Sequence, residues 1–208
     1  MNKAEFDAFV EVSKEMKNIT ADYDLMGVLF KFKMFSRANL DFYFTNAWER
    51  IPAEHLYANW ITVLSDCDRA NYRRMFNPRL IEKLREVNKH STVYNPSLQR
   101  RLDDDGFLTI YHVHAKPTMA GSYSWTTEPE IAHFFGGRNA KHMGLDDYYV
   151  VSGKVRLEDV IAHITDRNEE EVVVLNKDVK RKTKESFKRS GDIYSSFDDV
   201  LAMIAKQN

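Results

Sequence analysis

The sequence predicts an α+β fold, with a helical first half followed by short strands and one central helix. In the first half, apolar side chains recur three or four positions apart, as on one face of a helix. From residue 107 onward, short segments alternate apolar and polar residues, the pattern of a half-buried strand. We therefore expect a helical region over residues 1–105 that packs on a core formed by residues 106–208.

The composition is that of a globular intracellular protein. The chain has 208 residues, 43% of them hydrophobic and 12% aromatic, which is enough for one sizeable core. Lys and Arg number 30 against 31 Asp and Glu, so no global field draws the chain to nucleic acid or membrane. A single cysteine, Cys67, excludes an intrachain disulfide framework. Without a signal-peptide pattern or a run of bilayer length, we expect a cytoplasmic protein that does not enter membranes.

The helical region carries no recognisable chemistry. Residues 40–50 predict an amphipathic helix, and the alternation at 30–34 predicts a strand. Asn77-Pro78 is a cap-like start, and Asp103 to Gly106 predict a loop into the second half. The helical stripes are Phe6, Phe9, Val10 and Met16; Leu56, Trp60, Val63, Leu64 and Cys67; and Leu80, Ile81, Leu84 and Val87.

Two strands and a helix follow. Residues 107–114 predict the first strand, and residues 122–127 predict a second, shorter one. One side of the first strand carries Leu108, Ile110 and His112, and the other carries Tyr111 and Val113.

The helix is predicted from its end signals. Thr127 and Glu130 match a capping box, which opens a helix from Pro129 to Phe135. The pair Gly136-Gly137 is expected to end that helix.

Three glutamates, Glu169, Glu170 and Glu171, precede the hydrophobic run from Val172 to Leu175. Strand alternation puts Glu169 and Glu171 on one face and turns Glu170 away. In glycoside chemistry such a pair divides the work: one carboxylate stabilises a cationic sugar carbon while the other orients the nucleophile. The alternative interpretation is an exposed acidic turn at a strand entrance.

The ordered set of motifs resembles the ADP-ribosyltransferase superfamily, in particular its arginine-serine-glutamate branch. In that branch a first-strand motif is followed by Ser-Thr-Ser or Ser-Trp-Thr, a helix of the form A-x-x-F, and E-x-E before a strand. This chain has Ser124-Trp125-Thr126, Ala132 to Phe135, and Glu169 to Glu171, so the resemblance covers about residues 107–175. It implies a pair of small, largely antiparallel sheets around an NAD cleft.

The resemblance also implies a role for each motif residue. Glu171 would accept a hydrogen bond from the 2′-hydroxyl of the nicotinamide ribose and stabilise the oxocarbenium-like transition state. Glu169 would orient the acceptor and help to deprotonate it. Ser124 and Thr126 would hold NAD and the catalytic glutamate by hydrogen bonds, and Trp125 or Phe134 would wall the nicotinamide pocket.

One position departs from the pattern. The branch has arginine at the end of the first strand, where this chain has His112 after Tyr111. The poly-ADP-ribosyltransferase and diphtheria-toxin branch uses a first-strand histidine to bind a ribose of NAD. A neutral imidazole brings no permanent charge for the pyrophosphate, so we expect Arg138 to supply it, with Arg100 or Arg101 as the other candidates.

The resemblance therefore predicts a mono-ADP-ribosyltransferase with NAD as its substrate and no metal. The acceptor would be a macromolecule, first a protein arginine and otherwise a nucleic acid. Family analogy suggests a toxin of a toxin-antitoxin or phage-defence system, with an antitoxin as partner, or a phage effector.

Two other functions remain open from the sequence. His112 and His114 could share a metal in a hydrolase site. A catalytically silent member of the same fold could bind a partner through its helical half.

The basic segment from Lys177 to Arg189 has two interpretations: a surface that binds nucleic acid or an acidic protein, or a solvated loop. Residues 195–206 predict a closing helix.

Overall fold

The computed structural model describes residues 3–4, 7–8, 10–11, 40–66, 75–93, 95–115, 122–165, 169–189 and 196–207. The chain forms two compact units, Met1–Asn88 and Lys89–Asn208, so the boundary between units follows Asn88 and not residue 105. The later part of the expected helical region belongs with the sheet, because Leu98 is in the sheet's core and Leu102 bridges to Leu108. The predicted strand at 30–34 lies outside the described residues.

The first unit contains the stripes predicted at Leu56–Leu64 and Leu80–Val87, whereas Phe6, Phe9, Met16 and Cys67 lie outside the described residues. Helix α3 (Leu40–Ala47) continues into a 3-10 turn, η3 (Trp48–Arg50), as the pattern at 40–50 predicted. Helix α4 (Ala53–Asp66) follows, and then α6 (Pro78–Val93), whose residues from Lys89 onward belong to the second unit. Trp60 is fully buried, and its indole N–H donates to the Met75 carbonyl at 3.1 Å. The stripes of α4 and α6 form the core of this unit through Leu56, Trp60, Val63, Leu80, Ile81 and Leu84.

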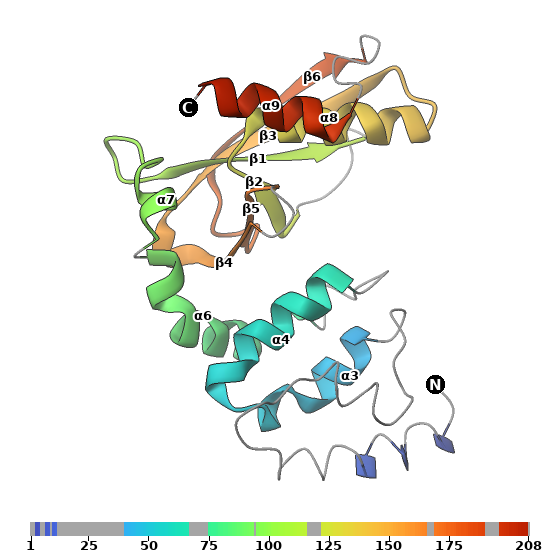
Figure 1. Ribbon diagram of the computed structural model, residues 1–208, viewed down its shortest axis with the longest axis vertical. Coiled ribbons are helices and arrows are strands. Elements are labelled where there is room, and N and C mark those ends of the chain that lie inside the picture. The colour runs from blue at the N-terminus through green and yellow to red at the C-terminus, as the bar shows by residue number, and fades with distance from the viewer. Residues whose placement is uncertain are drawn as a thin grey trace. The chain divides into compact units, whose positions relative to one another are not determined.

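The second unit is built on one six-stranded antiparallel sheet with the order β4-β5-β2-β1-β3-β6 (Figure 1). Its strands are β1 (Leu108–His114), β2 (Ser124–Thr126), β3 (Asp147–Val155), β4 (Val160–Ile164), β5 (Glu171–Val174) and β6 (Lys180–Lys188). A short 3-10 turn, η4 (Leu157–Asp159), connects β3 to β4, and α7 (Pro96–Gln99) precedes β1.

The expected pair of sheets is thus a single sheet, but its two halves are weakly joined. The halves β4-β5-β2 and β1-β3-β6 meet through one registered pair, Tyr111 opposite Thr126. All three residues of β2 pair with β5, but only Thr126 pairs with β1.

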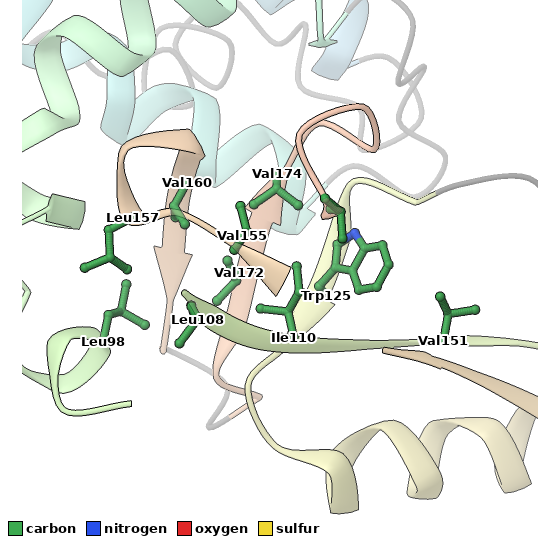
Figure 2. Packing of buried hydrophobic residues seen from close by; sticks show 11 residues of the cluster. Leu98, Leu108, Ile110, Trp125, Val151, Val155, Leu157, Val160, Val172 and Val174 are labelled. Carbon is green, nitrogen blue, oxygen red and sulfur yellow. The ribbon is translucent and has the colours of Figure 1, made fainter. Parts of the chain in front are cut away.

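The two faces of the sheet bury different clusters. On one face, side chains from β1, β3, β4, β5 and α7 gather in one cluster with Trp125 of β2 (Figure 2). On the other face, Tyr111, Tyr148 and Val150 pack against Ala132 and Ala140 of α8 (Pro129–His142). Because side chains alternate along β1, neighbouring residues such as Tyr111 and His112 belong to opposite faces.

Helix α8 begins at Pro129 as predicted, but its cap and its end differ from the prediction. It runs through Gly136 and Gly137 to His142, and its start has no capping box, because Glu128 is the N-cap and makes no side-chain cap bond. Gly136 serves close packing: a Cβ there would lie 2.3 Å from Cδ2 of Tyr148. The glycine therefore lets the helix approach β3 and does not end it.

The basic segment forms the edge strand β6, not a loop, and residues 180–186 are exposed. Helix α9 (Phe197–Gln207) closes the chain as predicted and packs on α8, with Val200 buried. None of the helices in the described ranges has the length and apolar character needed to cross a bilayer.

Candidate functional site

The sheet and α8 border a cavity of about 230 Å³ in the second unit. Six of the eight sequence-predicted site residues line it: Glu169, Glu171, His112, Ser124, Trp125 and Thr126. The opposite wall comes from α8, through Ile131, Phe135 and Asn139. Tyr111 of β1, Thr126 of β2 and Glu171 at the start of β5 share the sheet face next to this helix, a polar group facing an apolar wall as in many ligand sites. His112 and Trp125 alternate to the opposite face of the sheet, where their rings are in contact.

Three lining residues form one row across the sheet. Tyr111 on β1 is opposite Thr126 on β2, and Thr126 is opposite Glu171 on β5. Residues directly opposite each other on neighbouring strands point to the same face. Tyr111, Thr126 and Glu171 therefore face the α8 side of the sheet together.

The carboxylate of Glu171 has no hydrogen-bond or ion-pair partner among the described residues. It is half-buried at the first position of β5. A half-buried carboxylate without a protein partner is available to a ligand hydroxyl or to a developing positive charge.

Glu169 reaches the same cavity by a route that differs from the predicted strand alternation. Strand β5 begins only at Glu171, and Glu170 has a φ of 45°, in the left-handed region. This conformation costs a residue with a side chain roughly 1–3 kcal/mol, so the surroundings must hold it. Glu170 does point away, as predicted, but through a strained turn.

The side chain of Glu170 is bound on the far side of that turn. Its Oε2 accepts a hydrogen bond from Nε2 of His163 on β4, at 3.0 Å. The bond to His163, followed by the nearby charge of Arg101, holds the pKa of Glu170 below its ordinary value against the opposing effect of burial. The carboxylate of Glu170 is therefore used for structure.

Thr126 also has a structural use. Its hydroxyl donates to the backbone carbonyl of Glu169 at 2.8 Å and accepts from the backbone N–H of Glu128 at 3.1 Å. The hydroxyl of Ser124 bonds to neither cavity glutamate in the part of the chain that the structure describes. Of the two hydroxyls expected to hold the glutamates, the structure thus gives Thr126 a bond to this segment, through its backbone.

The imidazole of His112 lies against the indole of Trp125, with 5.5 Å between ring centroids, and against His114 at 4.7 Å. Burial, and then the neighbouring His114, lower the pKa of His112 to about 4, although a hydrogen bond with the Ser124 backbone opposes the shift. The ring is therefore neutral near pH 7. A neutral ring can bind a hydroxyl but adds no charge for a phosphate.

Phe134 and Arg138, the other two predicted site residues, lie outside the lining of this cavity. Phe134 packs against both Phe135 and Phe197, with ring centroids 5.4 and 5.3 Å away. Phe135 lines the cavity in its place, because consecutive residues of a helix point about 100° apart. The guanidinium of Arg138 is exposed and lies 4.6 Å from the ring centroid of Phe135, one aromatic ring away from the cavity.

The other candidate cations have local partners. Arg101 forms an ion pair with Glu128 at the start of α8. The Nε of Arg100 donates to the Pro96 carbonyl at 3.3 Å.

Sequence reasoning missed two polar lining residues, Tyr111 and Asn139. The phenol of Tyr111 makes no hydrogen bond within the described ranges, and burial, followed by the charges of Glu130 and Glu128, raises its pKa. It is therefore a protonated donor. Asn139 follows Ile131 and Phe135 at intervals of four, a helix-face signal that was hidden by the expectation that the helix ended at Gly136.

The histidine pair does not gather further metal ligands. His112 and His114 are in ring contact, but no group of three His, Cys, Asp or Glu side chains in the described part of the chain is placed to hold a metal ion. Nδ1 of His114 is buried and has no hydrogen-bond partner.

Comparisons with family models, with curated proteins and with solved structures found no match to this chain.

Proposed function

We propose that this protein is a mono-ADP-ribosyltransferase that cleaves NAD and transfers ADP-ribose to a macromolecular acceptor. The observation that carries the proposal is the meeting of Glu169 and Glu171 in one cavity with the hydroxyl-bearing strand β2 and with His112. These residues come from motifs that lie up to about sixty positions apart in the sequence, in the order typical of the family they resemble.

The carboxylate of Glu171 is suited to the bond-breaking step. The bond between the nicotinamide nitrogen and the ribose carbon breaks, and nicotinamide leaves with the electron pair. Positive charge then develops on the ribose, where a carboxylate without a protein partner stabilises it strongly in a site that excludes water. Glu169 takes the proton of the attacking acceptor, whose lone pair forms the new bond.

The cavity suits one end of NAD. At about 230 Å³ it is smaller than the roughly 300–1,000 Å³ typical of sites that bury a drug-sized ligand. The nicotinamide and its ribose would fill it, against the ring of Phe135 and beside the donor hydroxyl of Tyr111. The remainder of the dinucleotide would extend outside, where Arg138 is the nearest candidate for the pyrophosphate.

The acceptor is a protein side chain, with arginine as the first choice, or a nucleic acid. Activity against a host macromolecule would suit a toxin of a toxin-antitoxin or phage-defence system, held in check by an antitoxin, or a phage effector. The basic edge strand β6 favours an acidic acceptor surface.

The test is incubation of the purified protein with NAD labelled in its adenylate part and with a cell lysate. Release of nicotinamide and transfer of label are expected, and digestion with protease or nuclease shows which fraction carries the label. Glu171→Gln should lower the rate of both reactions by about a hundredfold or more, because the amide keeps the shape and loses the charge. Glu169→Gln should spare NAD hydrolysis and suppress transfer. Absence of nicotinamide release from the wild-type protein would reject the proposal.

A further inference from the structure

A chain of three side chains runs from α7 through β4 to the glutamate turn. The Oδ1 of Asn95 caps α7 by accepting from the backbone N–H groups of Ser97 and Leu98. Its amide nitrogen therefore faces Nδ1 of His163, at 3.1 Å. On the other side of the imidazole, Nε2 lies 3.0 Å from Oε2 of Glu170.

These contacts fix the tautomer of His163. Since the amide nitrogen of Asn95 can only donate, Nδ1 of His163 must accept, and the ring proton is on Nε2. That proton is donated to Glu170. Both nitrogens of a side chain that is only 4% exposed are thus used, without the imidazole touching the cavity.

The bond from His163 meets the chain at its strained residue. Glu170 has a φ of 45°, and its backbone carbonyl accepts from the N–H of Thr127 at 3.2 Å. The turn is therefore held through the Glu170 side chain by His163 of β4, and through the Glu170 backbone by Thr127, which lies between β2 and α8. Such a conformation persists where the surroundings determine it from several sides.

We propose that His163 is a positioning residue: its bond to Glu170 holds the left-handed turn that directs the carboxylates of Glu169 and Glu171 into one cavity. The catalytic part of this inference rests on the proposed function, whereas the structural part does not. Because the two carboxylates flank the turn directly, a relaxed turn moves both of them. Misplacement of a reacting group by about 1 Å can lower a rate by about a hundredfold.

The kinetic test compares single-turnover NAD cleavage in His163→Ala, Glu170→Ala and the double variant. Each single variant should lose about tenfold to a hundredfold in the cleavage rate, with a much smaller change in KM for NAD. The double variant should be no slower than the slower single variant, because both remove the same bond. A structural role without positioning would leave the rate at saturating NAD unchanged, and that result would overturn the proposal.

Conservative variants separate the bond from the strain. Glu170→Gln keeps an acceptor oxygen for His163 and should retain most of the rate. Glu170→Gly loses the bond but accepts a positive φ without strain, so its rate should lie between those of the Gln and Ala variants. His133→Ala is the matched control. His133 is on α8, its ring forms a hydrogen bond of 2.9 Å with the Tyr148 hydroxyl, and it lies outside the cavity lining. It should keep the wild-type rate.

Hydrogen exchange separates this inference from the proposed function. The Thr127 amide, which bonds the Glu170 carbonyl, should exchange about tenfold faster in His163→Ala than in wild type. Unchanged exchange of the Thr127 amide would overturn the inference that His163 holds the turn, whatever the activity. Faster exchange in a protein that cleaves no NAD would support that inference and reject the proposed function.

Discussion

The hydroxyl of Thr126 donates a hydrogen bond of 2.8 Å to the backbone carbonyl of Glu169, across 43 positions of sequence. The same oxygen accepts from the N–H of Glu128, which is the N-cap of α8. One buried hydroxyl thus ties the first cavity glutamate to the start of the helix that forms the opposite wall. The two walls of the cavity are therefore mechanically connected at Thr126.

Replacing Thr126 by Val should destabilise the protein by about 1–3 kcal/mol, because the shape-matched side chain removes both hydrogen bonds of the buried Thr126 hydroxyl. Thr126→Ser keeps the hydroxyl and should recover most of this loss. Denaturant unfolding of both variants measures the difference. Equal stability of the Val variant and wild type would show that water replaces both bonds.

His112 predicts a pH dependence of stability. An unfolded histidine titrates near 6.5, whereas the folded pKa of His112 is about 4. Between these values the unfolded chain binds a proton that the folded chain does not, so stability is full above pH 6.5 and falls as the pH drops. From pH 7 to pH 5 this residue should account for about 1–2 kcal/mol, allowing for its partial exposure.

Denaturant unfolding at several pH values checks this. His112→Gln should flatten the fall in stability toward pH 5. The exposed His142 on α8 gives the control, since His142→Gln should leave the wild-type slope. A slope that His112→Gln does not change would mean that the imidazole of His112 is solvated in the folded state.

The adjacent glycines of α8 should respond to alanine in opposite directions. Gly136→Ala puts a methyl group 2.3 Å from a ring carbon of Tyr148 and should destabilise the fold by about 1–3 kcal/mol. At Gly137 nothing lies within 4 Å of the new methyl group, so Gly137→Ala should stabilise by about 0.5–1 kcal/mol through helix propensity. Thermal or denaturant unfolding distinguishes the two, and destabilisation by both variants would contradict the packing role of Gly136.

The exposed strand β6 tests the class of acceptor. If the acceptor is a nucleic acid, replacing Lys180, Arg181 and Lys182 by Ala should weaken its binding and flatten the salt dependence, by about one log-log unit for each lost phosphate contact. Titration of a labelled oligonucleotide at several salt concentrations measures this.

Cleavage of NAD should be unaffected by the triple replacement, since none of the three residues lines the cavity. Replacing three exposed cations outside β6, Arg79, Lys141 and Lys206, is the control for the loss of three charges. If the salt dependence of oligonucleotide binding does not change in the β6 variant, these cations do not contact phosphate. They would then serve to prevent the edge strand from pairing with other sheets, as lysines on edge strands commonly do.

The sequence by itself determined the elements that rest on local periodicity. The alternation in 107–114 predicted β1, and the glutamates before a β-branched run predicted the start of β5. It also predicted that Glu169 and Glu171 share a surface while Glu170 points away, but the strained turn at Glu170 produces this arrangement, and strand alternation does not. The two strands follow from neighbouring residues, because burial on one face imposes a period of two on a strand.

Only the tertiary structure decided the features that depend on distant partners. Helix α8 continues through Gly136, and the residue there is glycine because Tyr148 leaves no room for a side chain. The row of Tyr111, Thr126 and Glu171 depends on strand register across two pairings, and the turn at Glu170 depends on a histidine held by Asn95 from 68 positions away. Strand pairing, close packing and side-chain hydrogen bonds join residues far apart in sequence, so the local pattern around a residue does not identify its partner.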